Sequence, residues 1–248
     1  MATVESMSVI EEEQPDPARE GLSLDLSSRP CWVVCIARAG SGKSVLVRSI
    51  MHSAAKQGVY KHIICFTQTG KCLNDEYKWL PDHAVRECKD VEQVFEIFDK
   101  LKRWKRANPT KQIEPWALVL DDIYGQASSK LVYNPRWSHI VACFRHYSCS
   151  IFISVQFWSA ISPHMRSAVD YLAVFQTRSK AAIQGLYAIC DAHFDSKRDF
   201  MRLLQESTKK KHHCMFYDAR APDRESAFRS FVATPPPDFK LKFEPCGL

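Results

Sequence analysis

The chain has 248 residues, of which 46% are hydrophobic and 25% are charged, and its formal net charge is +6. A chain of this length and composition can bury one substantial core, so a second domain is not required. No apolar run approaches the roughly 18 residues of a membrane span, and the acidic N-terminus is unlike a secretory signal, so we expect an intracellular protein with no membrane partner.

Residues 1–28 are acidic, contain two prolines and lack apolar periodicity, so we predict a flexible acidic N-terminal tail. The packed domain is expected over residues 29–233, and residues 234–248, which include three consecutive prolines, are expected to form an extended Pro-rich C-terminal tail. Residues 1–30 carry a net charge of −5, so the rest of the chain carries +11. A body this basic favours an anionic partner such as nucleic acid.

The octapeptide Ala-Arg-Ala-Gly-Ser-Gly-Lys-Ser occupies residues 37–44. It follows an apolar run at 32–36 and precedes a helix-like stretch at 45–51, which is the strand, loop and helix order of a P-loop. Glycines let backbone N–H groups turn toward a polyphosphate, the lysine adds positive charge, and the final serine can bind Mg²⁺. The residues predicted to hold a nucleoside triphosphate are Gly40, Ser41, Gly42, Lys43 and Ser44, and Ser44 is also a predicted Mg²⁺ ligand.

One position of this loop departs from the usual pattern, because Ala37 stands where the first glycine is expected. A methyl group there narrows the backbone conformations that the loop can adopt. Because of this departure, the alternative remains that the loop is degenerate and binds a nucleotide without hydrolysing it.

Apolar periodicity predicts alternating strands and helices along the rest of the chain. The expected strands are 61–66, 116–120, 150–155, 171–175 and 214–217, the last one before the tail. The expected helices are 90–107, 134–147, a short one after Pro163, 179–190 and 195–206. Asp90 is the expected N-cap of the first of these helices. In the helix at 134–147, the side chains expected to face inward are those of Trp137, Ile140, Val141 and Phe144. This alternation predicts an α/β fold, a P-loop NTPase three-layer sandwich with a mostly parallel sheet and its ligand at the carboxyl ends of the strands.

Two carboxylates follow the apolar strand at 116–120, in the pattern called Walker B. We predict that Asp121 belongs to the Mg²⁺ shell and that Asp122 is the general base that orients or deprotonates the attacking water. Aspartate is one methylene shorter than the more common glutamate at the second position. The alternative interpretation is a strand followed by a simple Asp-Asp turn.

Polar and basic residues also flank the strand at 150–155. Gln156 ends that strand and is a candidate sensor that hydrogen-bonds the γ-phosphate or its water, although it can also be a simple strand-ending amide. Arg145 precedes the strand and Arg166 follows it. Either arginine is a candidate finger for a neighbouring subunit's nucleotide, because a planar guanidinium offsets the charge that develops in phosphoryl transfer; each alone is more often a surface arginine.

Two clusters of basic residues stand out, at 102–106 and at 209–213. Either can bind nucleic-acid phosphate, and either can equally be a solvated surface. The second runs into His212, His213 and Cys214, which we interpret as a basic loop in preference to a zinc site. The ten cysteines are scattered without a C-x-x-C pair, and we interpret them as reduced core thiols.

Four segments together carry a resemblance: ARAGSGKS at 37–44, LVLDD at 118–122, FRHYSCSIFISVQ at 144–156 and ISPHMRSAVDYLAVF at 161–175. Over about residues 30–232 the chain resembles the poxvirus-type DNA-packaging ATPases of the FtsK and HerA superfamily, which implies a RecA/FtsK-like fold. By position, the resemblance implies that Lys43 and Ser44 bind phosphate and Mg²⁺, that Asp121 and Asp122 form Walker B, and that Gln156 is the sensor. It favours Arg145 as the finger, with Arg166 in reserve.

The resemblance implies a homo-oligomeric ring that hydrolyses ATP to drive double-stranded viral DNA into a preformed capsid. The implied partners are duplex DNA and a capsid or portal protein, and the implied location is the viral assembly site in the host cytoplasm or nucleus, or the virion. Two alternatives stay open, a small P-loop kinase and a nonhydrolysing DNA-binding protein with a degenerate loop.

Overall fold

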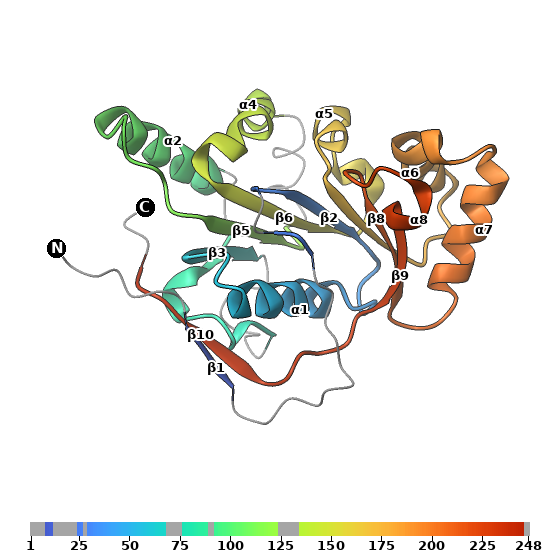
Figure 1. The fold of residues 1–248 in the computed structure, drawn as a ribbon, viewed down its shortest axis with the longest axis horizontal. Coiled ribbons are helices and arrows are strands. Elements are labelled where there is room, and N and C mark those ends of the chain that lie inside the picture. The colour runs from blue at the N-terminus through green and yellow to red at the C-terminus, as the bar shows by residue number, and fades with distance from the viewer. Residues whose placement is uncertain are drawn as a thin grey trace.

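The structure, a computed structural model, describes residues 8–11, 24–26, 29–67, 76–88, 92–123 and 134–245. Its centre is an eight-stranded sheet with the order β4-β3-β5-β6-β2-β7-β8-β9 (Figure 1). The strands are β2 (Trp32–Ile36), β3 (His62–Thr67), β4 (Val85–Glu87), β5 (Trp116–Asp121), β6 (Cys149–Val155), β7 (Tyr171–Phe175), β8 (His213–Asp218) and β9 (Phe228–Val232). The pairs from β4 to β7 are parallel, and β8 and β9 add two antiparallel pairs at one edge.

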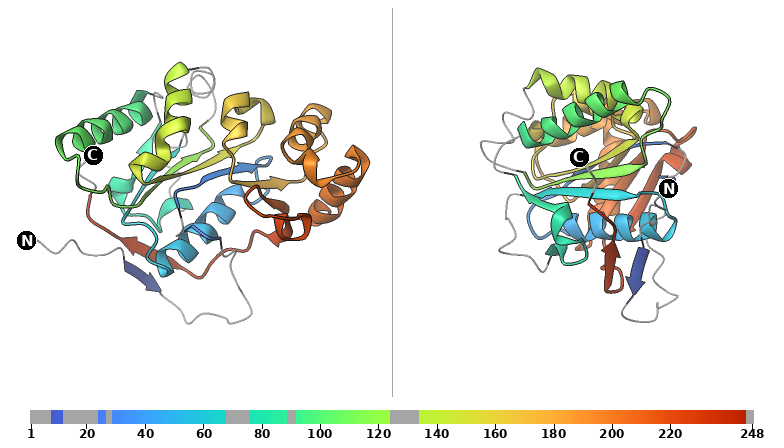
Figure 2. Two further views of the ribbon diagram at one scale, coloured as in Figure 1. Left: turned by 45° about the horizontal axis from the view of Figure 1, so that its top comes forward. Right: turned by 90° about the vertical axis from the view of Figure 1, so that its left-hand side faces the viewer.

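Helices cover both faces of this sheet, as Figures 1 and 2 show. One face carries α2 (Glu92–Ala107), α4 (Pro135–Cys143), α5 (Pro163–Ser167), α6 (Lys180–Cys190) and α7 (Lys197–Thr208), and the other carries α1 (Lys43–Lys56). A short helix, α8 (Arg224–Ala227), precedes β9. The result is the predicted three-layer α/β architecture, with the predicted mostly parallel sheet.

The central strand β2 shows why this sequence forms a doubly covered sheet. All five of its residues are buried. Val34 and Ile36 pack into the core beneath α2 and α4, whereas Val33 and Cys35 pack into the core beneath α1. Successive side chains of a strand point to opposite faces, so a continuous apolar run fits a strand that is covered on both sides.

The helix predicted at 134–147 is confirmed with one refinement. α4 ends at Cys143 and continues as a 3₁₀ turn over Phe144–Tyr147. Trp137 and Phe144 are buried, and their ring centroids lie 5.8 and 5.6 Å from that of Trp32 on β2. The predicted N-cap Asp90 lies outside the described residues.

The prediction that 214–217 is the last strand before the tail was wrong. β9 follows it and pairs antiparallel with β8, so that Tyr217 lies opposite Phe228. All five β9 side chains are partly or fully exposed, because β9 is the edge strand of the sheet. An edge strand carries no continuous buried run, and that was the signal on which the prediction relied.

The predicted tails also differ in part from the structure. Backbone pairing joins β1 (Ser8–Glu11) to β10 (Phe239–Lys242) as a two-stranded antiparallel sheet next to α1. Phe239 and Leu241 are each 2% exposed, and the Leu241 amide donates to the Trp79 carbonyl at 2.8 Å. Residues 239–242 alternate apolar and basic side chains, which is a strand pattern that the neighbouring prolines obscured.

The described cysteines support the interpretation as reduced thiols. Eight of them are free, seven being buried and Cys143 being half-buried. Burial is the main cause that raises the pKa of Cys31 and of Cys214 to about 12, so both thiols stay neutral. Cys72 and Cys246 lie outside the described residues. Within the described ranges, no helix combines the length and the hydropathy needed to cross a bilayer.

Candidate nucleotide-binding site

The loop between β2 and α1 has the backbone that a phosphate cradle needs. Gly40 and Gly42 adopt left-handed φ angles of 72° and 107°, a region that L side chains rarely adopt. A Cβ at Gly42 would also lie 3.0 Å from Ala233 Cβ, whereas nothing lies within 4 Å of a Cβ at Gly40. Gly40 therefore leaves open space for a ligand. Gly42 is needed for the turn of the backbone and for its close packing against Ala233.

The start of α1 is suited to an anion. Gly42 is the N-cap without a side-chain cap, and the first turn holds no acidic residue. Backbone N–H groups of a first helical turn have no partner within the helix, and they carry the positive end of the helix dipole. Lys43 is only 7% exposed, and Ser44 is half-buried at the second helical position.

Ala37 does not strain the loop. The non-glycine residues with positive φ in the described part are Asp122, Ser148 and His212, so Ala37 keeps an ordinary backbone. Its amide donates to the Val155 carbonyl at 3.0 Å, which continues the β2–β6 ladder by one residue. The departure from the usual glycine therefore costs this loop nothing in backbone conformation.

Asp121, the last residue of β5, is 2% exposed. Its two carboxylate oxygens accept hydrogen bonds from the hydroxyls of Tyr77 and Ser154. Burial, followed by the neighbouring Asp121 carboxylate, raises the pKa of Tyr77 far above its usual range, so the phenol stays protonated and donates. Neither partner was among the residues predicted from the sequence. Ser154 could have been found from the register, because it lies opposite Asp121 on β6.

The sequence-based assignment of Asp121 to a Mg²⁺ shell predicts that Tyr77→Phe raises the Mg²⁺ concentration for half-maximal ATP hydrolysis about 10-fold, because groups that orient a metal-binding carboxylate tune metal affinity. The measurement is a Mg²⁺ titration of hydrolysis at fixed ATP. Tyr60→Phe is the matched control, since Tyr60 is also buried and packs against Phe152. An unchanged Mg²⁺ curve with a lowered melting temperature would show that Tyr77 only supports the fold.

Asp122 faces Lys43 and Gln156 at the carboxyl ends of three neighbouring strands. The Gln156 amide donates to both Asp122 carboxylate oxygens, at 3.0 and 2.9 Å. Lys43 Nζ lies 3.8 Å from the nearer of these oxygens. The φ angle of Asp122 is 48°, a left-handed conformation that aspartate tolerates better than most residues. The three side chains therefore converge beside the P-loop.

The two arginines lie at different ends of the sheet. Arg145 precedes β6, at the amino ends of the strands, and its guanidinium donates to Asp170 at 2.8 and 3.0 Å. Arg166 lines a cavity of about 550 Å³ at the carboxyl ends, together with Ala37 and Gln156. The fold thus brings Arg166, and not Arg145, to the edge of the P-loop site.

Residues 23–220 match the protein family described as Poxvirus A32 protein, which covers well over half of the chain. The chain belongs to the poxvirus A32 family. Two viral relatives of this A32-family chain carry the names uncharacterized protein L437, from Acanthamoeba polyphaga mimivirus, and uncharacterized protein 075L, from Invertebrate iridescent virus 6. L437 is 26% identical over 77% of this chain and 67% of its own length, and 075L is 26% identical over 62% of this chain and 58% of its own length.

Among solved structures, the fold of this A32-family protein is similar to that of the genome packaging NTPase B204 from Sulfolobus turreted icosahedral virus 2, in complex with ATP-gammaS. The TM-score is 0.57 at 16% identity, over 81% of this chain and 96% of B204. At this identity the likeness shows the fold alone, an α/β fold of the P-loop NTPase type with a mostly parallel sheet. The predicted family and fold class are confirmed.

Proposed function

We propose that this protein is an ATP-hydrolysing motor that moves double-stranded viral DNA into a preformed capsid. The observation that carries the proposal is the convergence of Lys43, Asp122 and Gln156 next to the glycine loop, with Gln156 within 3.0 Å of Asp122 and Lys43 within 3.8 Å. Such a set pairs a phosphate-binding cation with a carboxylate and an amide that can handle a water molecule. Those are the parts that nucleotide hydrolysis needs.

The residues present fit MgATP. The open space at Gly40 and the uncapped start of α1 suit the polyphosphate, and the buried Asp121 carboxylate, with Ser44, suits a hard cation that prefers oxygen ligands. When bound, Mg²⁺ supplies a charge that offsets the negative charge on the phosphate oxygens. Tyr77 and Ser154 hold the Asp121 oxygens in place through their hydroxyl groups.

In this proposal Asp122 is the general base for the attacking water, and Gln156 holds its carboxylate and senses the γ-phosphate. Asp122 suits the role because its side chain is 37% exposed, so water reaches it, while Lys43 beside it is nearly buried. The backbone amide of Asp122 lies 3.2 Å from Ser154 Oγ, which links the position of Asp122 to the same serine that contacts Asp121.

Three further points support a DNA-packaging role over other uses of the site. The chain outside residues 1–30 carries a charge of +11, which suits a polyanion. The chain belongs to the A32 family, and its fold is similar to that of a protein described as a genome packaging NTPase. We extend the proposal to a homo-oligomeric ring that docks on a capsid or portal protein at the viral assembly site, in the host cytoplasm or nucleus or in the virion.

The test is steady-state ATP hydrolysis with and without long duplex DNA, for the natural sequence and for Lys43→Ala. The proposal expects hydrolysis that duplex DNA stimulates and that Lys43→Ala abolishes. ADP formation that depends on a small acceptor instead of DNA, with the γ-phosphoryl group transferred to that acceptor and not released as phosphate, would identify a kinase. ATP binding without turnover, at every protein concentration and with DNA present, would identify a nonhydrolysing DNA-binding protein.

Arg166 is the arginine that we propose for the nucleotide, acting within its own subunit because it lines the same cavity as its own Gln156. Arg166→Ala is expected to lower kcat by about 10³-fold, the usual worth of such an arginine, and Arg145→Ala by less than about 5-fold. Mixing Arg166→Ala subunits with Lys43→Ala subunits is expected to leave the mixture inactive. Restored hydrolysis in that mixture would show instead that Arg166 reaches a neighbouring subunit.

A further inference from the structure

The turn between α7 and β8 places three exposed lysines, Lys209 to Lys211, at the nucleotide edge of the sheet. β8 runs antiparallel to β7, with Cys214 opposite Phe175, so β8 begins where β7 ends. β7 in turn runs parallel to β2, whose carboxyl end leads into the P-loop. This turn, which we call the lysine turn, therefore lies on the same edge as the P-loop.

The residue after the lysine turn, His212, contacts the P-loop directly. Its Nδ1 lies 3.2 Å from the Ser41 carbonyl oxygen, and it would lie 3.5 Å from a Cβ at Gly42. His212 holds a left-handed φ of 63°, and its own carbonyl accepts from the Ala233 amide at 2.9 Å. One side chain thus joins the lysine turn to the loop that holds phosphate.

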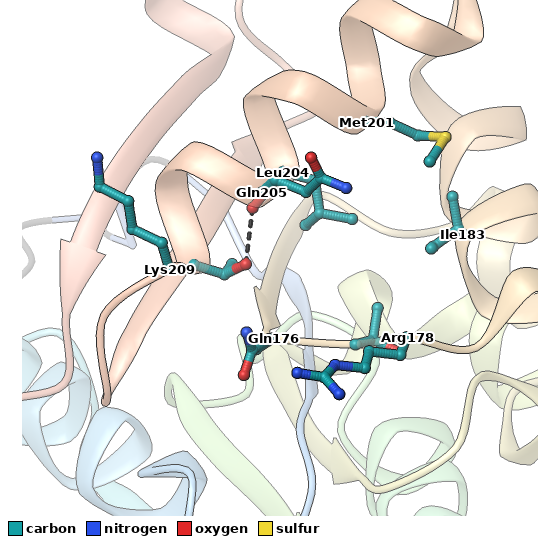
Figure 3. Close-up of a pocket in the computed structure, with 9 residues that line it drawn as sticks. Gln176, Arg178, Ile183, Met201, Leu204, Gln205 and Lys209 are labelled. Carbon is teal, nitrogen blue, oxygen red and sulfur yellow. Dashed lines mark hydrogen bonds between the residues drawn. The ribbon is translucent and has the colours of Figure 1, made fainter.

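Other polar and basic side chains lie beside the lysine turn. Lys209 and Arg178 line a cavity of about 280 Å³ together with Gln176 and Gln205, and in Figure 3 Arg178 points toward Gln176 while Lys209 points away from the cavity. The acidic group on the nearby turn of α7 is the exposed Glu206, which offsets one of the cations. The exposed side chains of Lys209 to Lys211 and of Arg178 outnumber this carboxylate.

The basic cluster at 102–106 lies at the opposite end of the sheet. It forms the end of α2, from which the chain leads into the first residue of β5, so it lies at the amino ends of the strands. Within it, Lys105 Nζ donates to the Lys111 carbonyl at 2.6 Å. This cluster has no described contact with the P-loop, and it provides a control of similar charge.

We infer that the lysine turn binds the phosphate backbone of duplex DNA and that His212 carries this contact to the P-loop. The inference rests on the proposed function, because it takes DNA as the partner. Exposed lysines bind backbone phosphates without reading sequence, and each contact releases counterions. When DNA binds and displaces the lysine turn, His212 moves with the turn. This movement shifts the Ser41 carbonyl in the P-loop, which His212 contacts.

The first experiment measures affinity for a fluorescent duplex over a range of salt concentrations, without nucleotide. Replacing Lys209, Lys210 and Lys211 together by alanine is expected to weaken binding at least about 10-fold and to reduce the slope of log affinity against log salt by about 3. Replacing Lys102, Arg103 and Arg106 together by alanine is expected to change that slope by less than about 1. Equal effects of the two triple variants would overturn the inference.

The second experiment measures the ratio of ATP hydrolysis with DNA to hydrolysis without it. The lysine-turn variant and His212→Gly are both expected to bring this ratio close to one, whereas His212→Gly is expected to bind duplex within about 2-fold of the natural sequence. Glycine keeps the left-handed backbone, so its effect reports the lost imidazole. Asparagine also tolerates this backbone and offers a polar side chain, and His212→Asn is expected to restore part of the stimulation.

The outcomes separate this inference from the function on which it rests. If the natural sequence shows DNA-stimulated hydrolysis and the lysine-turn variant keeps it, the inference fails and the motor proposal stands. If the natural sequence never hydrolyses ATP but its salt slope depends on the lysine turn, the motor proposal fails and the DNA surface stands. A raised KM for ATP without DNA in the lysine-turn variant would mean that these lysines serve the nucleotide, which overturns the inference.

Discussion

Asp122→Asn is expected to lower kcat for ATP hydrolysis by about 10²–10⁴-fold, the range that a general base contributes, with little loss of ATP binding. The amide cannot take a proton from water, yet it has nearly the same size as the carboxylate. In the natural sequence the Gln156 amide donates to both Asp122 oxygens, at 3.0 and 2.9 Å. In the variant the asparagine side-chain oxygen can still accept one of these hydrogen bonds. Single-turnover hydrolysis and equilibrium binding of a labelled ATP analogue measure the two effects separately.

Asp122→Glu is the matched control, since it keeps the carboxylate and moves it outward by one methylene. We expect it to retain more activity than the asparagine variant. If Asp122→Asn and the natural sequence hydrolyse ATP at similar rates, Asp122 is not the base. If the variant loses ATP binding together with hydrolysis, the pairing with Lys43, 3.8 Å away, matters for assembling the site instead.

Asp170→Ala is expected to lower the free energy of unfolding by about 2 kcal/mol, because it removes a buried carboxylate and leaves the buried backbone amide of Trp32 without its acceptor. The Asp170 side chain is 6% exposed and accepts from the backbone amide of Trp32 at 2.8 Å as well as from Arg145. Arg29 lies 3.6 Å from it. Chemical denaturation followed by tryptophan fluorescence measures the change.

Asp99→Ala is the control for this prediction, because Asp99 pairs with Arg136 on the surface and its side chain is 57% exposed. Exposed pairs contribute at most about 1 kcal/mol, so the two variants should differ clearly. Equal stabilities would show that Asp170 is not a structural anchor. A normal stability combined with lost ATP hydrolysis would return Arg145, the partner of Asp170, to the list of candidate fingers.

Much of the fold and the central part of the site could be predicted from the sequence because their signals are local. The P-loop lies in eight consecutive residues, and Asp122 and Gln156 each follow a buried apolar strand. Parallel strands bring their carboxyl ends to one edge, so residues at those ends converge whatever their separation in the chain. The convergence of Lys43, Asp122 and Gln156 follows from this rule.

The contacts that the sequence did not reveal join segments with no shared local pattern. Tyr77 reaches Asp121 across 44 residues, and His212 reaches Ser41 across 171 residues. Asp170 accepts hydrogen bonds from the Arg145 guanidinium and from the backbone amide of Trp32, which lies 138 residues away in the sequence. Such contacts depend on how the strands are ordered in the sheet, and neither propensity nor periodicity encodes that order.

Displacement of a third strand from duplex DNA tests the central claim most directly, because a motor that moves along the duplex strips off a triplex-forming strand. We expect release of the labelled third strand that requires ATP and duplex DNA flanking the triplex, and no release with Asp122→Asn. DNA-stimulated hydrolysis without any strand release would contradict it, and so would release that continues in Asp122→Asn or with a nonhydrolysable ATP analogue.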